Sequence, residues 1–210
     1  MKRTFRFSFF LWLLPFLPAC GLQKPYPEAP GTIFIRQQIC DLDDFKKSFF
    51  RPQNDLKGHG FLAYRFLRDP KDPKTYILAF QCSNLDKGVR FIQSSNFLTA
   101  CIGSGMGLPL LWAGVEVEGR PYTNLAQMSG GMVVARYEVT DYEAWKKNWD
   151  AETKAGATGL YRLPGNPEAV IVTKEAPDIT RAEPAAQNAA TPGVTRQDLW
   201  LGSNLEEGAF

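Results

Sequence analysis

The sequence predicts an α+β protein built from two tandem copies of one β-α-β-β-α-β unit. Residues 34–46 and 134–146 align without a gap at an offset of 100 residues (134 − 34). Each copy then shows strand-like runs separated by helix-like runs in the same order, which is typical of an internal repeat. The two segments share residues at matching positions: Arg36 and Arg136, Asp41 and Asp141, Lys46 and Lys146.

Each copy opens with a strand and a helix. Residues 32–39 and 132–139 alternate and are rich in β-branched side chains, which predicts strands. Asp41 and Asp141 stand where a helix N-cap is expected. The helices are expected over 42–56 and 142–155, where aromatic residues recur at the spacing of a buried helical stripe. These residues are Phe45 and Phe49 in the first copy and Tyr142, Trp145 and Trp149 in the second.

The remaining elements of each copy follow in the same order. Pro-rich turns separate two further strands, and a helix and a last strand complete the unit. The expected ranges are strands 60–67 and 75–81, helix 85–102 and strand 122–128 in the first copy, and strands 159–163 and 169–174, helix 179–190 and strand 196–202 in the second. The repeat also aligns Tyr64-Arg65 with Tyr161-Arg162, and Ala113-Gly114-Val115 with Pro192-Gly193-Val194.

Residues 130–203 resemble the dimeric α/β-barrel superfamily, and residues 32–128 resemble it more loosely. The resemblance is carried by Val139-Thr-Asp-Tyr-Glu-Ala-Trp-Lys146 and by Asn166-Pro-Glu-Ala-Val-Ile-Val172. It implies ferredoxin-like units that pair sheet against sheet, so two copies on one chain imply an intramolecular pseudo-dimeric barrel that is monomeric. That superfamily includes monooxygenases, haem-degrading enzymes, lactone isomerases and polyketide cyclases, so the fold does not select an activity.

The N-terminus predicts an export signal. Lys2, Arg3 and Arg6 precede the uncharged run Phe7–Leu17, which is shorter than the roughly 20 residues of a transmembrane helix. Leu17-Pro18-Ala19-Cys20 resembles the lipobox of bacterial lipoproteins. The resemblance implies cleavage before Cys20, lipid on its thiol and, because Gly21 follows, an outer-membrane location facing the periplasm.

The chain therefore divides into an export signal, a tether and a duplicated folded region. Without the signal, 21 basic residues (24 − 3) face 22 acidic ones, so the balance excludes a generic nucleic-acid binder. The expected segments are a signal peptide over 1–19, a lipidated Pro-rich tether over 20–31, one repeat over 32–129 with an apolar insertion at 103–112, a second repeat over 130–203, and a frayed tail over 204–210.

The apolar segment 97–115 has two interpretations. Its 19 uncharged residues are just long enough to cross a membrane. They also contain several glycines and Pro109, and they fall where the repeat needs a helix and a loop. We therefore expect a buried helix followed by an apolar flap. The flap would cover the barrel mouth, contact a membrane surface or bind a partner.

Strand alternation predicts which side chains line the barrel. Ile33, Ile35 and Ile39 suit a face covered by helices, so the alternate residues face inward. An inward arginine is costly unless it is paired. Arg36 and Arg136 are therefore either structural ion pairs, with Glu138 as a partner, or the frame of a site for an anionic ligand. The candidate ligand-binding residues are Arg36, Gln38, Tyr64, Arg136 and Tyr161.

The candidates for chemistry are few. His59, the single histidine, lies in a glycine-flanked loop, and with Glu138 it is a weak candidate for acid–base catalysis; a histidine can also bind haem. The spacing of Cys40, Cys82 and Cys101 matches no metal-binding pattern, so we expect these residues to be small buried hydrophobic residues. A disulfide between Cys40 and Cys82 is the alternative if their strands are adjacent. We predict no metal and no cofactor, with haem as the one alternative that the resemblance raises.

The sequence supports two hypotheses of different class. The first is an envelope-anchored lipoprotein that binds a small apolar or anionic ligand, or a partner, without catalysis. The alternative is a cofactor-light monooxygenase or isomerase, which requires His59 or Glu138 inside the barrel beside Arg36 or Arg136.

Overall fold

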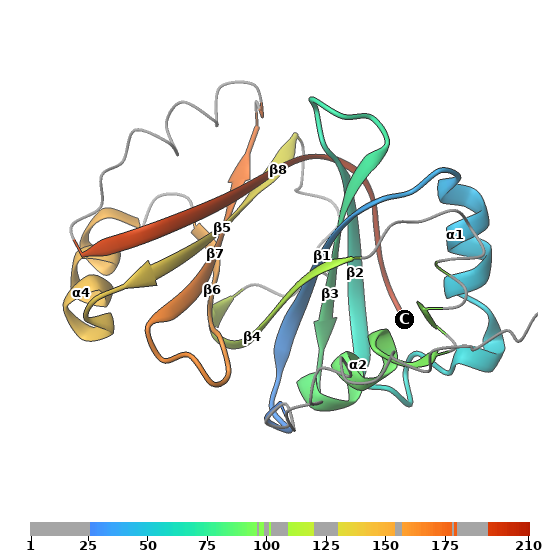
Figure 1. The fold of residues 1–210 in the computed structure, drawn as a ribbon, viewed down its shortest axis with the longest axis horizontal. Helices are drawn as coiled ribbons and strands as arrows, with labels where there is room; N and C mark the ends of the chain where they lie inside the picture. Colours follow the sequence, from blue (N-terminus) through green and yellow to red (C-terminus); the bar gives the residue numbers. More distant parts are fainter. Residues whose placement is uncertain are drawn as a thin grey trace, which may run out of the picture.

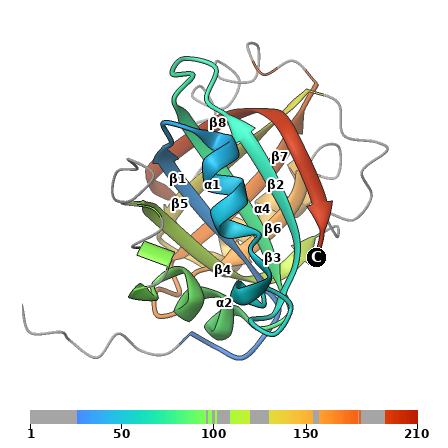
Figure 2. The same ribbon diagram turned by 90° about the vertical axis from the view of Figure 1, so that its right-hand side faces the viewer.

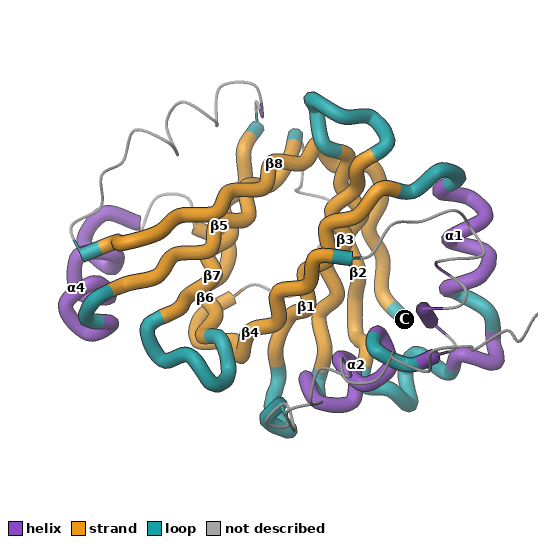
Figure 3. The backbone as a smooth tube through the Cα atoms, viewed as in Figure 1, coloured by secondary structure: helices purple, strands orange, loops and turns teal. Residues whose placement is uncertain are grey.

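The computed structural model describes residues 26–95, 97, 98, 101, 109–119, 130–153, 157–177, 179 and 193–210. It confirms an α+β protein dominated by strands (Figure 3). All described elements lie within residues 31–210, so a chain that starts at Gly21 contains the whole described fold. In chain order the elements are β1 Gly31–Gln38, α1 Leu42–Phe49, η1 Pro52–Asn54, β2 Phe61–Arg68, β3 Thr75–Cys82, α2 Leu85–Ile92, β4 Leu110–Gly119, β5 Gly131–Val139, α4 Tyr142–Thr153, β6 Ala157–Arg162, β7 Ala169–Ala176 and β8 Val194–Ala209.

The eight described strands form one closed barrel in the order β1-β3-β2-β8-β5-β7-β6-β4. Every neighbouring pair is antiparallel, so β1, β2, β5 and β6 run one way and the other four run back. The strands of each half are neighbours, and the halves meet where β2 pairs with β8 and β4 pairs with β6. In Figure 1, β8 runs from the side that carries α4 to the side that carries α1.

The pairing registers repeat between the two halves. Arg36 lies opposite Ile77 and Leu110, and Arg136 lies opposite Ile171 and Asp198. Following these ladders across each half, the equivalent inward residues are Trp112 and Trp200, Gly114 and Gly202, and Leu67 and Tyr161.

This register corrects two of the sequence matches. Tyr161 is equivalent to Leu67 rather than to Tyr64, and Gly114 is equivalent to Gly202 rather than to Gly193. Both second strands contain an irregularity in their pairing, between Phe61 and Ala63 in β2 and between Ala157 and Gly159 in β6, so alternation counted from the start of either strand does not give the face of its later residues. An extra residue of this kind inverts the face on which every later side chain lies.

Helices α1 and α2 lie on the outside of β1, β3 and β2 (Figure 2). Helix α1 begins at the predicted N-cap, where the backbone N–H of Asp44 donates to Asp41 Oδ1 over 3.0 Å. Its buried stripe is the predicted one, Phe45 and Phe49. Ile33 and Ile35 pack with this outer cluster, as the alternation of β1 predicts.

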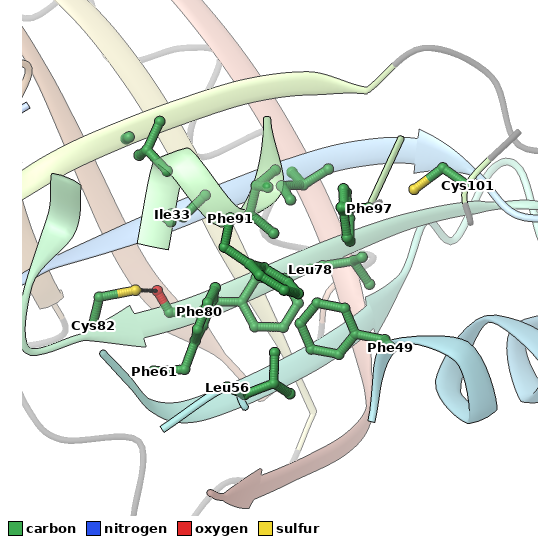
Figure 4. Close-up of a cluster of buried hydrophobic side chains, with 14 of the residues drawn as sticks. Ile33, Phe49, Leu56, Phe61, Leu78, Phe80, Cys82, Phe91, Phe97 and Cys101 are labelled. Atoms are coloured by element: carbon green, nitrogen blue, oxygen red, sulfur yellow. Dashed lines mark hydrogen bonds between the residues drawn. The ribbon is translucent and has the colours of Figure 1, made fainter. Parts of the chain in front are cut away.

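An aromatic cluster fills the space between these helices and the sheet (Figure 4). The Phe49 ring lies at its centre, 2% exposed and 4.9 Å from the stacked Phe80 ring. The C-terminal Phe210 also reaches this cluster, 5.9 Å from Phe61. Further rings within 6.5 Å of Phe49 come from six residues: Phe45, Phe50, Phe61, Phe91, Phe97 and Phe210.

Both helices of the first half end before their predicted limits. Helix α1 stops at Phe49 instead of residue 56, because Pro52 prevents a continuous helix and starts the short helix η1. Helix α2 stops at Ile92 instead of residue 102. Just after its end, the side chain of Ser94 accepts a hydrogen bond from the backbone N–H of Phe97 over 3.3 Å, in the manner of a helix cap.

The largest difference from the sequence prediction concerns β4. Leu110, Leu111 and Trp112, expected in an apolar flap, belong to this strand, so the membrane-span interpretation is wrong for residues 110–115. The run looked uniformly apolar because both faces of the strand are covered: Leu111, Ala113 and Val115 pack on the helix side. The predicted strand 122–128, helix residues 180–190 and the insertion residues 103–108 lie outside the described residues.

The predicted frayed tail is also wrong, because β8 continues to Ala209. Residues 204–209 pair with β2, and the backbone N–H of Phe210 donates to the Leu62 carbonyl over 3.1 Å. The sequence did not reveal this because the tail is polar. Its two glutamates alternate across the strand, and each lies near a basic residue of the first half: Lys46 or Arg65.

We predict that Phe49→Ala lowers the free energy of unfolding by about 3–5 kcal/mol, because it leaves a cavity in the aromatic cluster. Leu62→Ala is the matched control: Leu62 is 45% exposed, and its truncation should cost at most about 0.5 kcal/mol. Urea denaturation followed by circular dichroism measures both. Equal effects of the two substitutions would show that the cluster is not the main core.

Candidate binding site in the barrel interior

The barrel interior is a second core, to which all eight described strands contribute. Trp112 and Trp200 stack across it, with ring centroids 3.5 Å apart and planes 15° from parallel. The Tyr161 ring meets Phe34 edge-on at 5.4 Å. Other buried members are Ala63, Leu67, Ile77, Ala79, Met132, Val134 and Ile171.

Two equivalent glycines make this close packing feasible. A Cβ on Gly114 would lie 2.6 Å from Tyr161 Cβ, and a Cβ on Gly202 would lie 2.5 Å from Leu67 Cβ. Both distances are far inside van der Waals contact, so a side chain at either glycine would push two neighbouring strands apart. The glycines therefore let the tryptophan-bearing strands approach β6 and β2.

Arg36 and Arg136 lie near the same rim of the barrel, close to the ends of β1 and β5. Arg36 Nη2 donates to Asp69 Oδ2 over 3.0 Å. Arg136 Nη2 donates to Glu138 Oε1 over 3.0 Å, and its Nη1 lies 3.8 Å from Asp198 Oδ2. Two guanidinium groups therefore face three carboxylates, which favours the structural ion-pair interpretation of these arginines.

Arg65 is the buried charge that the sequence prediction missed. It faces the barrel interior from β2 and is 0% exposed. Its Nε donates to Asn204 Oδ1 over 3.0 Å and lies 3.6 Å from Glu207 Oε2, and its Nη1 contacts Met132 Sδ at 3.8 Å. One signal in β2 could have found it: if Ala63 faces the interior, alternation along the strand places Arg65, two residues later, on the same face.

Several inward-facing polar atoms lack a hydrogen-bond partner among the described residues. An unpaired buried donor or acceptor costs about 1–3 kcal/mol, so such atoms normally hold a water molecule or a ligand. They are Thr32 Oγ1, Arg36 Nε, Arg65 Nη2, Arg136 Nε and Glu207 Oε2, each with less than 1 Å² of accessible surface.

The other predicted site residues are dispersed. Tyr161 lines the interior, whereas Tyr64 lies outside the barrel, where it packs at 4.9 Å from Phe50 and donates to Glu206 Oε1 over 2.9 Å. Burial and this hydrogen bond raise the pKa of Tyr64 to about 12. Gln38 is exposed and donates to Asp72 over 3.4 Å.

The weak catalytic candidates do not meet. Glu138 is held by Arg136, whereas His59 lies outside the barrel, half-buried with its ring 4.8 Å from that of Phe91 on α2. Within the described residues, no cluster of His, Cys, Asp and Glu has the arrangement of a metal site. Among the described residues, no histidine or cysteine lies in the interior cluster, whereas Met132 and Tyr161 do.

The described cysteines form no disulfide. Cys82 lies opposite Gly31 at the start of β1, whereas Cys40 follows the end of that strand, so the two are at opposite ends of the ladder. Cys82 and Cys101 are buried, and burial raises the pKa of their thiols to about 12 and about 11. They are packing residues, as predicted; Cys40 is exposed.

The end of β8 is fastened on the outer face by Glu206. Lys46 Nζ on α1 donates to Glu206 Oε2 over 2.6 Å, and Tyr64 donates to its other oxygen. The hydrogen bond from Lys46 holds the pKa of Glu206 below its ordinary value of 4.5. The same pair raises the pKa of Lys46. Glu206 and Glu207 thus secure the two faces of one strand segment.

Among the described helices, none has the length and apolar composition that a bilayer crossing requires. The predicted lipobox lies outside the described residues.

No family model and no curated protein matches the chain. Solved structures do match its fold. A proposed chlorite dismutase aligns with a TM-score of 0.58 and 10% identity, over 84% of this chain and 95% of its own. A proposed monooxygenase from Lactobacillus acidophilus aligns with a TM-score of 0.51 and 13% identity, over 87% of this chain and 99% of its own. A mutant chlorite dismutase from Candidatus Nitrospira defluvii aligns with a TM-score of 0.53 and 15% identity, over 86% of this chain and 93% of its own. These neighbours have the dimeric α/β-barrel fold, and at such identities the likeness extends to the fold alone.

We predict that Glu206→Gln destabilises the protein by about 1 kcal/mol or less at neutral pH, because the carboxylate that accepts from Lys46 is partly exposed. Since the pKa of Glu206 is lowered on folding, its contribution is present above about pH 4.5 and is lost as the pH falls through the folded-state value. The gap between wild type and variant should therefore narrow in acid. Urea unfolding across pH tests this, with the exposed Glu168→Gln as control; a gap that widens in acid would refute it.

Proposed function

We propose that this chain is an envelope-anchored lipoprotein whose barrel interior binds a small molecule. In this proposal Cys20 carries lipid, residues 21–31 form a tether, and the barrel faces the periplasm from the outer membrane. The sequence supports the anchor through its basic start, short apolar run and lipobox-like Leu17–Cys20 segment. The closed barrel supports the second part of the proposal, that the domain encloses a binding site.

One observation carries the binding function: the inward-facing polar atoms without partners. Arg36 and Arg136 each keep a buried Nε–H, and Arg65 keeps a buried Nη2 group, that no described residue accepts. A barrel with a purely structural role would be more stable if these positions were apolar or fully paired. Their presence favours an interior that is completed by a ligand.

Binding is preferred to catalysis because the enzyme hypothesis has lost its supporting geometry. It required His59 or Glu138 to share a pocket with an inward arginine. His59 packs on α2 outside the barrel, and Glu138 already neutralises Arg136. The structural neighbours that are named as enzymes support the fold only.

The proposal includes an internal duplication. Residues 32–129 and 130–203 would be two ferredoxin-like copies that together replace the two subunits of a dimeric barrel. The repeated registers of Arg36 and Arg136 support this, as do the equivalent pairs Trp112–Trp200 and Gly114–Gly202. Because each copy's edge strand is taken up by the other copy, we expect a monomer.

We predict that the full chain, expressed in a bacterial host, is recovered in the membrane fraction and incorporates labelled palmitate, and that Cys20→Ala abolishes both. The physical reason is that acyl chains on Cys20 would supply the membrane affinity. Cys40→Ala is the matched control, since Cys40 is an exposed cysteine outside the lipobox-like segment. Persistent labelling of Cys20→Ala would contradict the lipid anchor.

We predict that the chain from Gly21 onward, purified and sprayed under native conditions, retains a small molecule that denaturation releases and mass spectrometry identifies. Arg65→Gln should reduce its occupancy, because it removes the inward Nη2 group without a partner. Arg68→Gln is the control, because Arg68 lies on the outer face, with its guanidinium 5.5 Å from the centroid of the Tyr76 ring. Absence of any bound or stabilising molecule would contradict the function.

A further inference from the structure

The Arg65–Glu207 pair differs from the ion pairs at the rim of the barrel. Its side chains are 1% and 7% exposed, so it is the most deeply buried of the ion pairs described. The separation of 3.6 Å between Arg65 Nε and Glu207 Oε2 exceeds the 2.7–2.9 Å of a strong charge-assisted hydrogen bond. Both Arg65 Nη2 and Glu207 Oε2 lack a hydrogen-bond partner among the described residues. Because one donor group and one acceptor atom of this buried pair are unused, a third group can form hydrogen bonds with both.

The remaining hydrogen-bonding positions define that group. Arg65 Nε is satisfied by Asn204, and its Nη1 is directed to the thioether of Met132. What remains is the Nη2 group of the guanidinium, which carries two N–H donors, and one oxygen of a carboxyl group. An acceptor atom can bind the first, and it can also bind the second when the carboxyl group is protonated and becomes a donor.

Charge selects Arg65 over the rim arginines for an anion. At the rim, Arg36 and Arg136 are already outnumbered by three carboxylates. Arg65 has a single acidic neighbour within ion-pair distance, Glu207. If Glu207 is protonated, the buried guanidinium is left with no counter-charge in contact, and this is costly unless an anion enters.

We propose that Arg65 and Glu207 form an internal site for a small monoanion, such as formate or a halide, which binds together with one proton. The proton goes to the Glu207 carboxylate, and the anion takes its place opposite the Arg65 guanidinium. The net charge of the site is zero before and after, because one negative charge replaces another. This site rests on the proposed small-molecule binding by the barrel and specifies its ligand class.

The surroundings of Glu207 favour proton uptake. Burial raises the pKa of Glu207 above its ordinary value, although Arg65 and a hydrogen bond with Asn204 act in the opposite direction. Glu175 on β7 adds like charge and acts with burial. Met132, the contact from β5, is uncharged, and Lys46 and Tyr64 engage Glu206 on the other face of β8.

The site exists once in the barrel. In the pairing register of the second half, Gly159 takes the position of Arg65 and lies opposite Gly119, where Glu207 would be. The space beside Gly159 is occupied by the Tyr161 ring, whose hydroxyl oxygen lies 2.5 Å from where a Cβ would stand. The halves thus share their framework but differ at this polar position.

Formate binding to the chain from Gly21 onward tests the site. Formate is titrated at about pH 5 and about pH 8, at constant ionic strength, and the shift in the thermal midpoint gives its Kd. Because one proton accompanies the anion, the Kd should rise about tenfold for each pH unit above the pKa of Glu207. Glu207→Gln, which fixes a neutral donor of the same shape, should bind formate equally at both pH values. The matched control Glu206→Gln should behave as wild type, because Glu206 lies on the outer face.

Two results would overturn the site: a Kd for formate that does not change with pH in the wild type, or a pH dependence that survives in Glu207→Gln. Failure of formate to stabilise the wild type at either pH would also overturn it. If a co-purified molecule is nevertheless present, the proposed function stands and only this site fails. If no molecule binds at all, both fail.

Discussion

The closure of the sheet across its two halves is the constraint on which the rest of this molecule depends. Each half alone would be a four-stranded sheet with two unpaired edges and a bare inner face. Pairing β2 with β8 and β4 with β6 removes all four edges and buries both inner faces against each other. Strand β8 is central to this, since its first part pairs with β5 and its last part with β2.

Closure also explains the unusual side chains of the interior. The barrel core is narrow enough that Trp112 and Trp200 stack directly, and it requires glycine at 114 and 202 to seat them. The pairing of β8 with β2 then brings Arg65 and Glu207 together, both buried, where an imperfect ion pair is expensive. A fold of this kind retains such a pair at a cost in stability, which is why we connect it with binding.

Local features of the sequence predicted much of the fold. The stripe of Phe45 and Phe49, the cap at Asp41 and the alternation of β1 are set by neighbours within a few residues, and the structure confirms them. Strand β4 was missed because a strand covered on both faces loses the alternation that identifies a strand. The pairing irregularities in β2 and β6 were equally invisible, and they misplaced Tyr64.

The candidate site was less predictable because its residues depend on distant partners. Arg36 and Arg136 were recognised through the repeat, but their acidic partners decide their role, and Asp69 and Asp198 were not foreseen. Arg65 has no basic equivalent in the second half, so the repeat gave no indication of it. Its partner Glu207 lies 142 residues later (207 − 65), in a polar tail that only the closed barrel draws into a strand.

The most direct test of the central claim, that the closed barrel holds a small ligand on its buried polar atoms, is anomalous diffraction from crystals of the chain from Gly21 onward soaked in bromide at about pH 5. We expect an anomalous peak inside the barrel within hydrogen-bonding distance of Arg65 Nη2 and Glu207 Oε2, and we expect it to vanish at about pH 8. An interior without bromide at either pH, in which Arg65 and Glu207 close into a direct hydrogen bond, would contradict the account.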